Sequence, residues 1–211
     1  MGSFTILVRE HSRRFYSPCM TVATRRFAAV VVCAATSLAF SVPAAHAQEL
    51  TLRDGTGDVW VSSGAGFTRA DGSKRADVTR VRVGHGAKRV VVTARLAVLA
   101  KRSFSIDGLR VQFRTNTGLR RDAMLSAQAG SRNGRVAFTS RTGKSPCTIA
   151  HKVDYVANTM MMSVPRSCLN SPRYVEFRSE TSWTNTRKVF IDNPHDDQTN
   201  SKDWSNRVRR G

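Results

Sequence analysis

The sequence has few of the residue patterns that mark an active site. Beyond residue 47 it contains three histidines, His85, His151 and His195, and none of them belongs to an H-E-x-x-H motif. It has no C-x-x-C pair and no G-x-S-x-G motif. These absences exclude the common signatures of zinc proteases, thioredoxin-like redox proteins and α/β-hydrolases. We therefore predict a protein that is not an enzyme.

Acidic residues are also scarce. The 211-residue chain has 34 Lys and Arg against 15 Asp and Glu, and beyond Ala47 the counts are 29 and 14. This surplus favours polyanionic partners such as cell-wall polymers, acidic polysaccharide, anionic lipid or nucleic acid, although solubility alone is an alternative. No RNP-like aromatic motif or helix-turn-helix pattern accompanies the charge, so specific nucleic-acid recognition is not predicted.

The chain has one long apolar run, from Phe27 to Val42, and it resembles an export signal. Arg25 and Arg26 precede the run, and Ala45-His46-Ala47 offers small residues at positions −3 and −1 of a cleavage site. This order is that of a secretory signal peptide. The run is shorter than the roughly 20 apolar residues that cross a bilayer. We predict a secreted protein with no membrane span after cleavage.

The predicted cleavage follows Ala47, so the mature protein would begin at Gln48. Residues 1–19 fit no part of a signal peptide, and Met20 is an alternative start of the chain. A single Arg-Arg pair does not decide between the general secretory and the twin-arginine export routes.

Helical periodicity is missing from the rest of the chain, where short β-rich runs alternate with Gly, Asn, Asp and Ser. The predicted strands are 77–83, 89–99, 109–115, 135–140, 149–155, 160–164, 173–178 and 188–192. Residues 123–129 are ambiguous between strand and short helix. About eight strands at this spacing predict an antiparallel β-sandwich or jelly roll over residues 48–192. Residues 193–211 are expected to form a loosely held polar tail.

Only two cysteines, Cys147 and Cys168, lie beyond the signal. An even number in an exported protein predicts a disulfide. The two residues are equidistant from a turn expected at Ala157-Asn158, and opposed residues of a hairpin lie close enough for a bridge. Because Pro165 cannot donate to a sheet, regular pairing could end there and leave Cys168 on a loop.

Two clusters of acidic residues are candidate sites. Asp54 and Asp58 flank a Gly-rich turn, and together with Asp77 they could bind calcium, which prefers oxygen ligands. Turn formation by Asp and Gly is the alternative. The segment from Asp192 to Asp197 contains three aspartates and His195, so a metal site or acid/base chemistry is conceivable there, with a polar loop as the alternative. No other cofactor is predicted.

Several arginines alternate with apolar residues and should therefore lie on an exposed sheet face. In Leu109–Thr115, Leu109, Val111 and Phe113 are expected to point inward, with Arg110 and Arg114 outward. Arg173 is expected on the same basic face. Three tryptophans, Trp60, Trp183 and Trp204, could stack on sugars, and Trp183 is the candidate for an exposed ring because its neighbours are polar.

One segment resembles a known family. The residues Val164-Pro165-Arg166-Ser167-Cys168-Leu169, followed by Pro172 to Phe177, resemble the late strands of family-9 carbohydrate-binding and DOMON-like jelly-roll modules. Asp54 to Asp58 and Asp77-Val78 are similar to the acidic N-terminal region of those modules, and the chain also resembles exported proteins of high-GC Gram-positive bacteria. The resemblance implies a jelly-roll fold. It does not identify a ligand, because no pair of exposed tryptophans and no Met/His pair for haem can be assigned.

Three hypotheses about function follow from the sequence. The first is a secreted, non-enzymatic binding domain whose basic face associates with an anionic cell-envelope polymer or polysaccharide. The second is a secreted hydrolase that uses the segment from Asp192 to Asp197. The third is a structural envelope protein without a ligand. The sequence makes no prediction of the oligomeric state.

Overall fold

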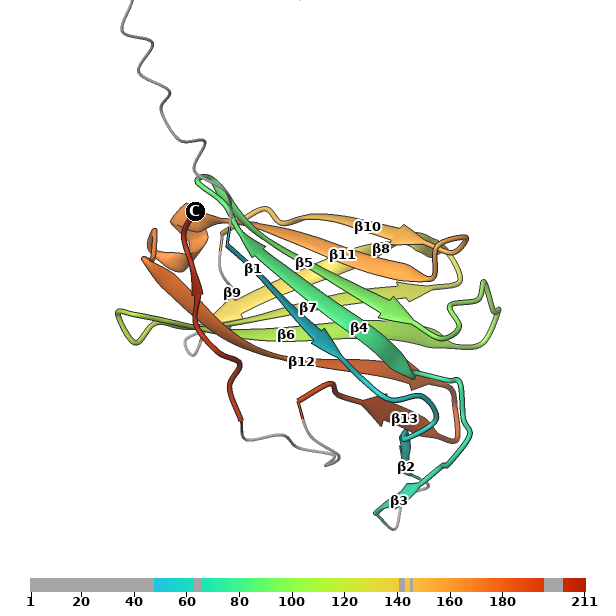
Figure 1. Ribbon diagram of the computed structural model, residues 1–211. Coiled ribbons are helices and arrows are strands. Elements are labelled where there is room, and N and C mark those ends of the chain that lie inside the picture. The colour runs from blue at the N-terminus through green and yellow to red at the C-terminus, as the bar shows by residue number, and fades with distance from the viewer. Residues whose placement is uncertain (1–47, 63–65, 141–142, 145, 196–202) are drawn as a thin grey trace, which may run out of the picture. The chain divides into compact units, whose positions relative to one another are not determined.

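Two antiparallel β-sheets form the part of the chain that the structure describes (Figure 1). The structure is a computed structural model, and it describes residues 48–62, 66–140, 143–144, 146–195 and 203–211. These residues contain no α-helix and one short 3₁₀ helix, η1 (Arg166–Leu169). The predicted all-β sandwich is therefore confirmed. The predicted signal peptide lies outside the described residues, among which no helix is long and apolar enough to cross a bilayer.

The smaller sheet has five strands in the order β1-β4-β5-β11-β10. Their bounds are β1 Gln48–Arg53, β4 Val78–His85, β5 Arg89–Leu96, β11 Thr159–Pro165 and β10 Ala150–Asp154. The strand β4 contains a bulge at Thr79, since Val78 pairs with Leu96 while Arg80 pairs with Arg95. A bulge of this kind bends the strand and redirects its side chains.

The larger sheet has nine strands, of which eight follow the order β3-β2-β13-β12-β6-β7-β8-β9; the ninth, β14, pairs with the start of β12, whereas β13 pairs with its end. Their bounds are β3 Phe67–Arg69, β2 Trp60–Ser62, β13 Val189–Asp192, β12 Tyr174–Thr184, β6 Ile106–Thr115, β7 Arg120–Gln128, β8 Ser131–Ser140, β9 Gly143–Lys144 and β14 Val208–Arg209. The ambiguous segment 123–129 is thus a strand, because Ala123, Leu125 and Ala127 alternate inward.

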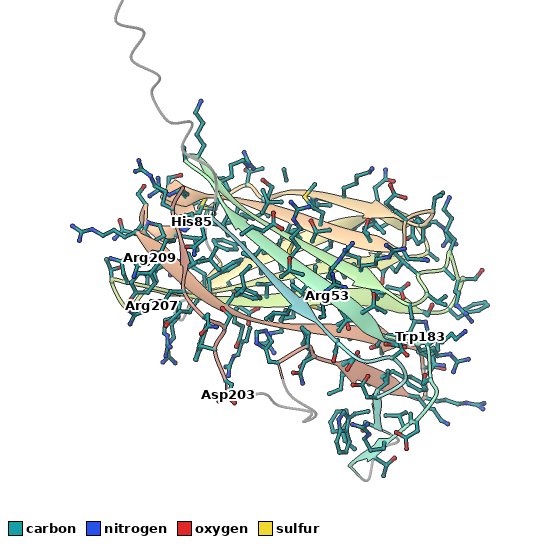
Figure 2. The ribbon with its side chains drawn as sticks, in the orientation of Figure 1. Arg53, His85, Trp183, Asp203, Arg207 and Arg209 are labelled. Carbon is teal, nitrogen blue, oxygen red and sulfur yellow. A yellow bond between two sulfur atoms is a disulfide. The ribbon has the colours of Figure 1, made fainter. Side chains whose placement is uncertain are left out.

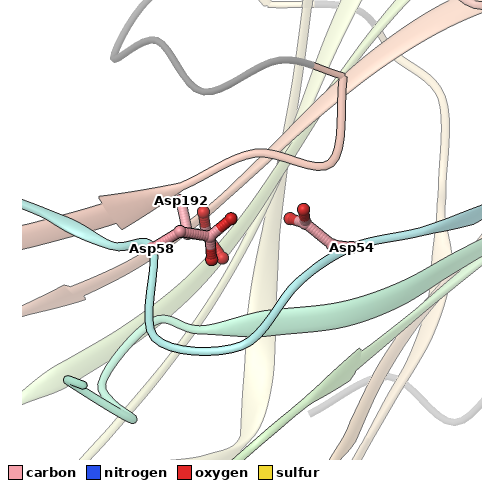
Figure 3. A group of neighbouring side chains, drawn as sticks. All are labelled: Asp54, Asp58 and Asp192. Atoms are coloured by element: carbon pink, nitrogen blue, oxygen red, sulfur yellow. The ribbon is translucent and has the colours of Figure 1, made fainter. Parts of the chain in front are cut away.

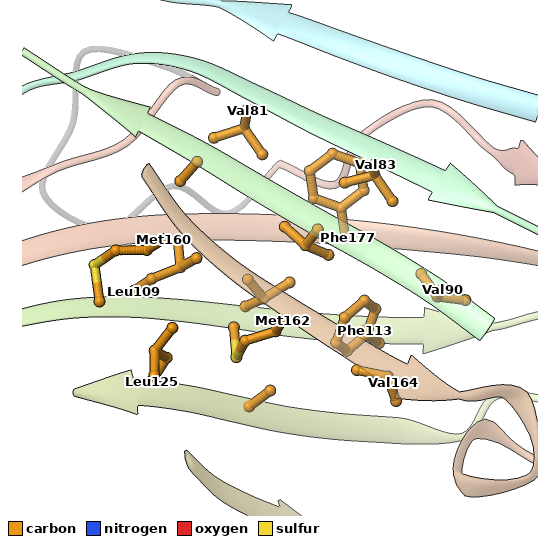
Figure 4. Packing of buried hydrophobic residues seen from close by; sticks show 14 of the residues in the cluster. Val81, Val83, Val90, Leu109, Phe113, Leu125, Met160, Met162, Val164 and Phe177 are labelled. Carbon is orange, nitrogen blue, oxygen red and sulfur yellow. The ribbon is translucent and has the colours of Figure 1, made fainter. Parts of the chain in front are cut away.

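The core fills the space between the two sheets (Figure 4). Phe113 and Phe177 from the larger sheet and Met160 and Met162 from the smaller sheet are fully buried there. Every second residue of β6 and β12 points inward, as the alternation in the sequence predicts. Burial of one face of each sheet fixes strand register, because a shift of one residue would expose the apolar side chains.

The C-terminal segment is held more firmly than the sequence predicts. Val208 of β14 is fully buried, and the carbonyl of Val208 accepts a hydrogen bond of 2.9 Å from Nδ1 of His85 on β4. Ser205 is also buried, and its amide donates to the carbonyl of Phe177 at 2.8 Å. For residues 203–211 the expected loose tail is therefore wrong, because this segment covers the open edge of β12 and contacts both sheets.

The Cys147–Cys168 disulfide is present, with a Cα–Cα distance of 5.9 Å. Its geometry differs from the prediction in one respect. In the β10–β11 hairpin, Asp154 pairs with Thr159, so in the same register Cys147 would lie opposite Arg166, two residues before Cys168. Cys147 precedes β10, and Cys168 lies in η1 after Pro165 ends the strand. The 3₁₀ turn therefore brings Cys168 back to Cys147.

Candidate functional site

The outer face of the larger sheet carries arginines that are paired with acids. Arg110 on β6 forms a salt bridge of 2.5 Å with Asp122 on β7, and Arg114 forms one of 2.6 Å with Glu176 on β12. Both arginines point outward, as predicted. Much of the positive charge expected on this face is thus neutralised by carboxylates on the neighbouring strands.

A tryptophan organises part of the same face. Guanidinium groups lie near the Trp204 ring at 4.7 Å for Arg114, 5.0 Å for Arg178 and 5.9 Å for Arg120. These distances are in the range of cation–π contacts. Arg173 is exposed and immediately precedes β12. Strand alternation therefore does not place it, and its grouping with Arg110 and Arg114 on one basic face stays a prediction.

The outer face of the smaller sheet has a different arrangement. Arg53 on β1 pairs directly with Arg80 on β4, and Arg80 pairs directly with Arg95 on β5. The three side chains, which we call the arginine row, are exposed, and Arg53 is labelled in Figure 2. Within the described residues, none of the three makes a salt bridge or a side-chain hydrogen bond. Like charges placed directly opposite each other destabilise a sheet.

The arginine row forms one wall of a cleft of about 400 Å³. The other lining residues are Thr79, Leu96, Ala97 and Asn158. Adjacent strands lie about 4.8 Å apart, so three opposed residues present their charges over about 10 Å. In the next row along the sheet, Arg82 forms a salt bridge with Glu49, which leaves the arginine row as the uncompensated part of this face.

Trp183 is buried and not exposed as predicted. Its side chain is 6% exposed and packs with Val59 and Phe190 in a small second cluster, because position 183 faces inward in β12. The guanidinium of Arg75 lies 4.6 Å from the Trp183 ring and covers it. Arg69 lies 5.5 Å from the Trp60 ring in a similar way. Arginines thus lie against the rings of all three tryptophans, where a sugar would otherwise stack.

Four aspartates converge where the two sheets meet at one end of the domain. Asp54 and Asp58 lie in the loop after β1, Asp77 immediately precedes β4, and Asp192 ends β13. One carboxylate oxygen each from Asp54, Asp58 and Asp192 lies within 4.8 Å of the others, and Figure 3 shows the three carboxyl groups facing one another. The fold therefore adds Asp192, from the other predicted acidic segment, to the predicted site of Asp54, Asp58 and Asp77. We call these four residues the acidic cluster.

Backbone contacts hold the acidic cluster in place. The amide of Val78 donates to Asp192 at 2.7 Å, and the amide of Gly57 donates to Asp77 at 3.0 Å. Gly57 has a φ of +80°, and a Cβ at this position would lie 2.9 Å from the backbone nitrogen of Gly72. A side chain at residue 57 would therefore push the loop away from the site.

Burial, and after it mutual repulsion, disfavours the charged form of the carboxyl groups in the acidic cluster. Burial, followed by the charges of Asp192 and Asp58, raises the pKa of Asp54 to about 7. Burial, followed by the charges of Asp58 and Asp77, raises the pKa of Asp192 to about 7. Burial likewise raises the pKa of Asp77. No arginine or lysine forms a salt bridge with these four groups among the described residues.

The predicted catalytic segment from Asp192 to Asp197 is divided by the fold. Asp192 belongs to the acidic cluster, whereas Nε2 of His195 accepts a hydrogen bond of 3.1 Å from the amide of Ser179 on the edge of β12. Asp196 and Asp197 lie outside the described residues. The imidazole of His195 therefore has a structural partner in the larger sheet.

Two members of the arginine row, Arg53 and Arg95, are not among the residues predicted from the sequence. Arg53 lies in QELTLR, where Leu50 and Leu52 alternate with polar residues, and this pattern could have identified β1. Arg95 lies in the predicted strand 89–99, where Val92, Ala94 and their even-numbered neighbours point inward in strict alternation and leave Arg95 on the outer face. The register that aligns the row across three strands leaves no local signal in the sequence.

Comparison with known proteins finds no matching family model, and no curated protein and no solved structure matches the chain.

Proposed function

We propose that this domain binds an anionic polymer of the cell envelope, such as an acidic or phosphate-bearing polysaccharide, through the arginine row. The observation that carries the proposal is the direct cross-strand alignment of Arg53, Arg80 and Arg95 without acidic partners among the described residues. The alignment of like charges destabilises the sheet when no ligand is bound. An anion in the cleft would offset this cost.

The chemistry of arginine supports the proposal. The guanidinium group presents a planar fork of donors that can bind a carboxylate, sulfate or phosphate with two hydrogen bonds. The chain contains 27 arginines and 7 lysines, and all three residues of the row are arginine. A row that runs across the strands suits a polymer with regularly repeated charges better than a single small anion.

The test is retention of the purified protein on immobilised heparin and on purified anionic wall polymer across a salt gradient. A variant with Arg53, Arg80 and Arg95 changed to Ser is compared with a variant in which Arg110, Arg114 and Arg173 are changed to Ser. Both variants lose three positive charges, so the difference between them reports position and not net charge.

We expect the variant of the arginine row to elute at clearly lower salt than the control variant. By analogy with counter-ion release from nucleic acids, each lost contact should reduce the slope of log affinity against log salt by nearly one. Equal shifts in both variants would reject a specific site and leave only general electrostatic attraction. Elution of the wild-type protein with a neutral protein would support the hypothesis of a structural protein without such a ligand.

A further inference from the structure

We propose that the acidic cluster binds one calcium ion and that this ion joins the two sheets at one end of the domain. The three carboxylate oxygens of Asp54, Asp58 and Asp192 lie within 4.8 Å of one another. Calcium binds oxygen at about 2.4 Å, so two ligands on opposite sides of the ion are about 4.8 Å apart. The spacing therefore allows the three oxygens to bind a single ion.

A buried oxygen without a partner is an independent indication of a missing ligand. Asp77 is 1% exposed, and its Oδ2 accepts the hydrogen bond from Gly57 inside the loop that carries Asp54 and Asp58. Its other oxygen, Oδ1, is buried and has no hydrogen-bond partner in the described structure. An unsatisfied buried carboxylate oxygen is costly, and a cation beside the loop would remove that cost.

The same deficiency extends to the neighbouring aspartates. Oδ2 of Asp54 and Oδ1 of Asp58 are also buried without a hydrogen-bond partner. In a chain with 34 Lys and Arg, four carboxylates converge with no salt bridge to a described basic side chain, and Lys74 acts on Asp77 only through its longer-range charge. A bound cation supplies the positive charge that the side chains do not.

The ligand atoms select the class of metal. The acidic cluster contains only carboxylates, and the group of ligand atoms within 4.8 Å of one another, from Asp54, Asp58 and Asp192, includes no histidine or cysteine. Hard oxygen ligands favour calcium, magnesium or manganese over zinc and copper. We assign calcium because an irregular loop with carboxylates suits its flexible coordination, whereas magnesium requires a nearly ideal octahedron at shorter distances.

The position of the ion gives it a structural role. Asp54 follows β1 and Asp77 precedes β4, both of the smaller sheet, whereas Asp192 ends β13 of the larger sheet. An ion between them connects both sheets and the loop 54–59 through one centre. Calcium should therefore stabilise the folded domain by mass action, because the unfolded chain does not bring these residues together.

The experiment compares the purified protein after treatment with EDTA and after addition of calcium or magnesium. Thermal unfolding is followed, and equilibrium dialysis measures the bound metal. At a calcium concentration 100 times the dissociation constant, we expect the midpoint of unfolding to rise by roughly 5–10 °C, with one ion bound per chain. Absence of a shift together with absence of stoichiometric binding would overturn the proposal, and an equal response to magnesium would overturn the assignment to calcium.

A double variant, Asp54→Asn and Asp58→Asn, separates ion binding from general stability. It should lose the response to calcium, yet in EDTA it should unfold at a higher temperature than the wild type, because two repelling charges are removed. Asp71→Asn is the matched control, since Asp71 lies in a nearby loop with a side chain 79% exposed and should keep the full response. If the double variant responds to calcium as the wild type does, the site is wrong. Asp58→Asn alone gives the same reading if the double variant does not fold.

Discussion

The two outer sheet faces of this domain use arginine in opposite ways. On the larger sheet, Arg110 and Arg114 pair with Asp122 and Glu176 on adjacent strands, and Trp204 lies against three guanidinium groups. On the smaller sheet, the arginine row aligns like charges with no acidic partner among the described residues. The comparison teaches that the number of arginines on a strand does not identify a binding face, whereas the partners of those arginines do.

The arginine row and the acidic cluster adjoin each other, yet their opposite charges do not pair. Arg53 and Asp54 are neighbours in sequence, but successive residues at the end of a strand point to opposite sides of the sheet. Arg53 therefore faces solvent, while Asp54 turns toward Asp58 and Asp192. The arginine row and the acidic cluster therefore lie on different sides of the backbone, although Arg53 and Asp54 are consecutive residues.

The largest effect is expected from the disulfide, which links the segment before β10 to η1 after β11, next to the smaller sheet. Changing Cys147 and Cys168 to Ser should lower the free energy of unfolding by about 3 kcal/mol, because the unfolded chain gains loop entropy. Denaturant titration of the purified, oxidised protein measures the loss. The bridge lies beside β10 and β11, so polymer retention below the unfolding temperature should not change. A loss of retention would mean that the bridge also positions the arginine row.

Substitutions at Trp204 test how much its contacts with arginines stabilise the larger sheet. Trp204→Ala should reduce stability by about 1–3 kcal/mol, since it removes three contacts with arginine and buried ring area that holds the C-terminal segment. Hydrogen exchange should then increase in residues 203–211. Trp204→Phe keeps an aromatic face and should lose less than half as much. Equal losses in the two variants would contradict stacking as the cause.

Asp107 lies on the inner side of the larger sheet, and its charge is only partly compensated. Burial raises the pKa of Asp107 to about 6, and the charge of Arg102 offsets this only in part. Because the folded state holds its proton to a higher pH than the unfolded state, stability should fall as the pH rises from about 4 to 6. Asp107→Asn should match the wild type at pH 4 and be more stable by about 1–3 kcal/mol at pH 7.5. A variant less stable than the wild type at pH 7.5 would show that the carboxylate has a favourable partner.

The smallest effects are expected at single arginines, and they should have opposite signs on the two faces. Arg114→Thr removes a salt bridge and a stacking contact, and it should cost about 1 kcal/mol. Arg80→Thr removes a like charge from between Arg53 and Arg95 and should raise stability by a few tenths of a kcal/mol at low salt. Both differences should shrink in high salt, because exposed charges are screened. Two variants with changes of the same sign would remove the distinction between the faces.

Much of the sandwich was predictable because local alternation determines which side of a strand is buried. In β6, the inward positions Leu109, Val111 and Phe113 follow from the sequence, as does the outward position of Arg110. Short strands such as β9 and β14 were not predicted, since two residues carry no usable alternation. Trp183 was misplaced because its polar sequence neighbours point outward while the ring itself points inward.

The candidate sites were less predictable, since each depends on residues distant in sequence. Asp54 and Asp58 lie close in the chain, but Asp192 joins them only when β13 packs beside the loop. The arginine row likewise depends on the order of β1, β4 and β5 and on the bulge at Thr79. Register and strand order are set by packing of the whole core, which short sequence patterns do not report.

The most direct test of the distinction between the two faces is a titration of isotope-labelled protein with an anionic oligosaccharide, followed by nuclear magnetic resonance. We expect the largest shifts at the side-chain Nε–H groups of Arg53, Arg80 and Arg95 and at the amides of β1, β4 and β5. Signals of Arg110 and Arg114 should move little, because Asp122 and Glu176 already occupy them. Shifts confined to the larger sheet, or spread evenly over both faces, would contradict the account.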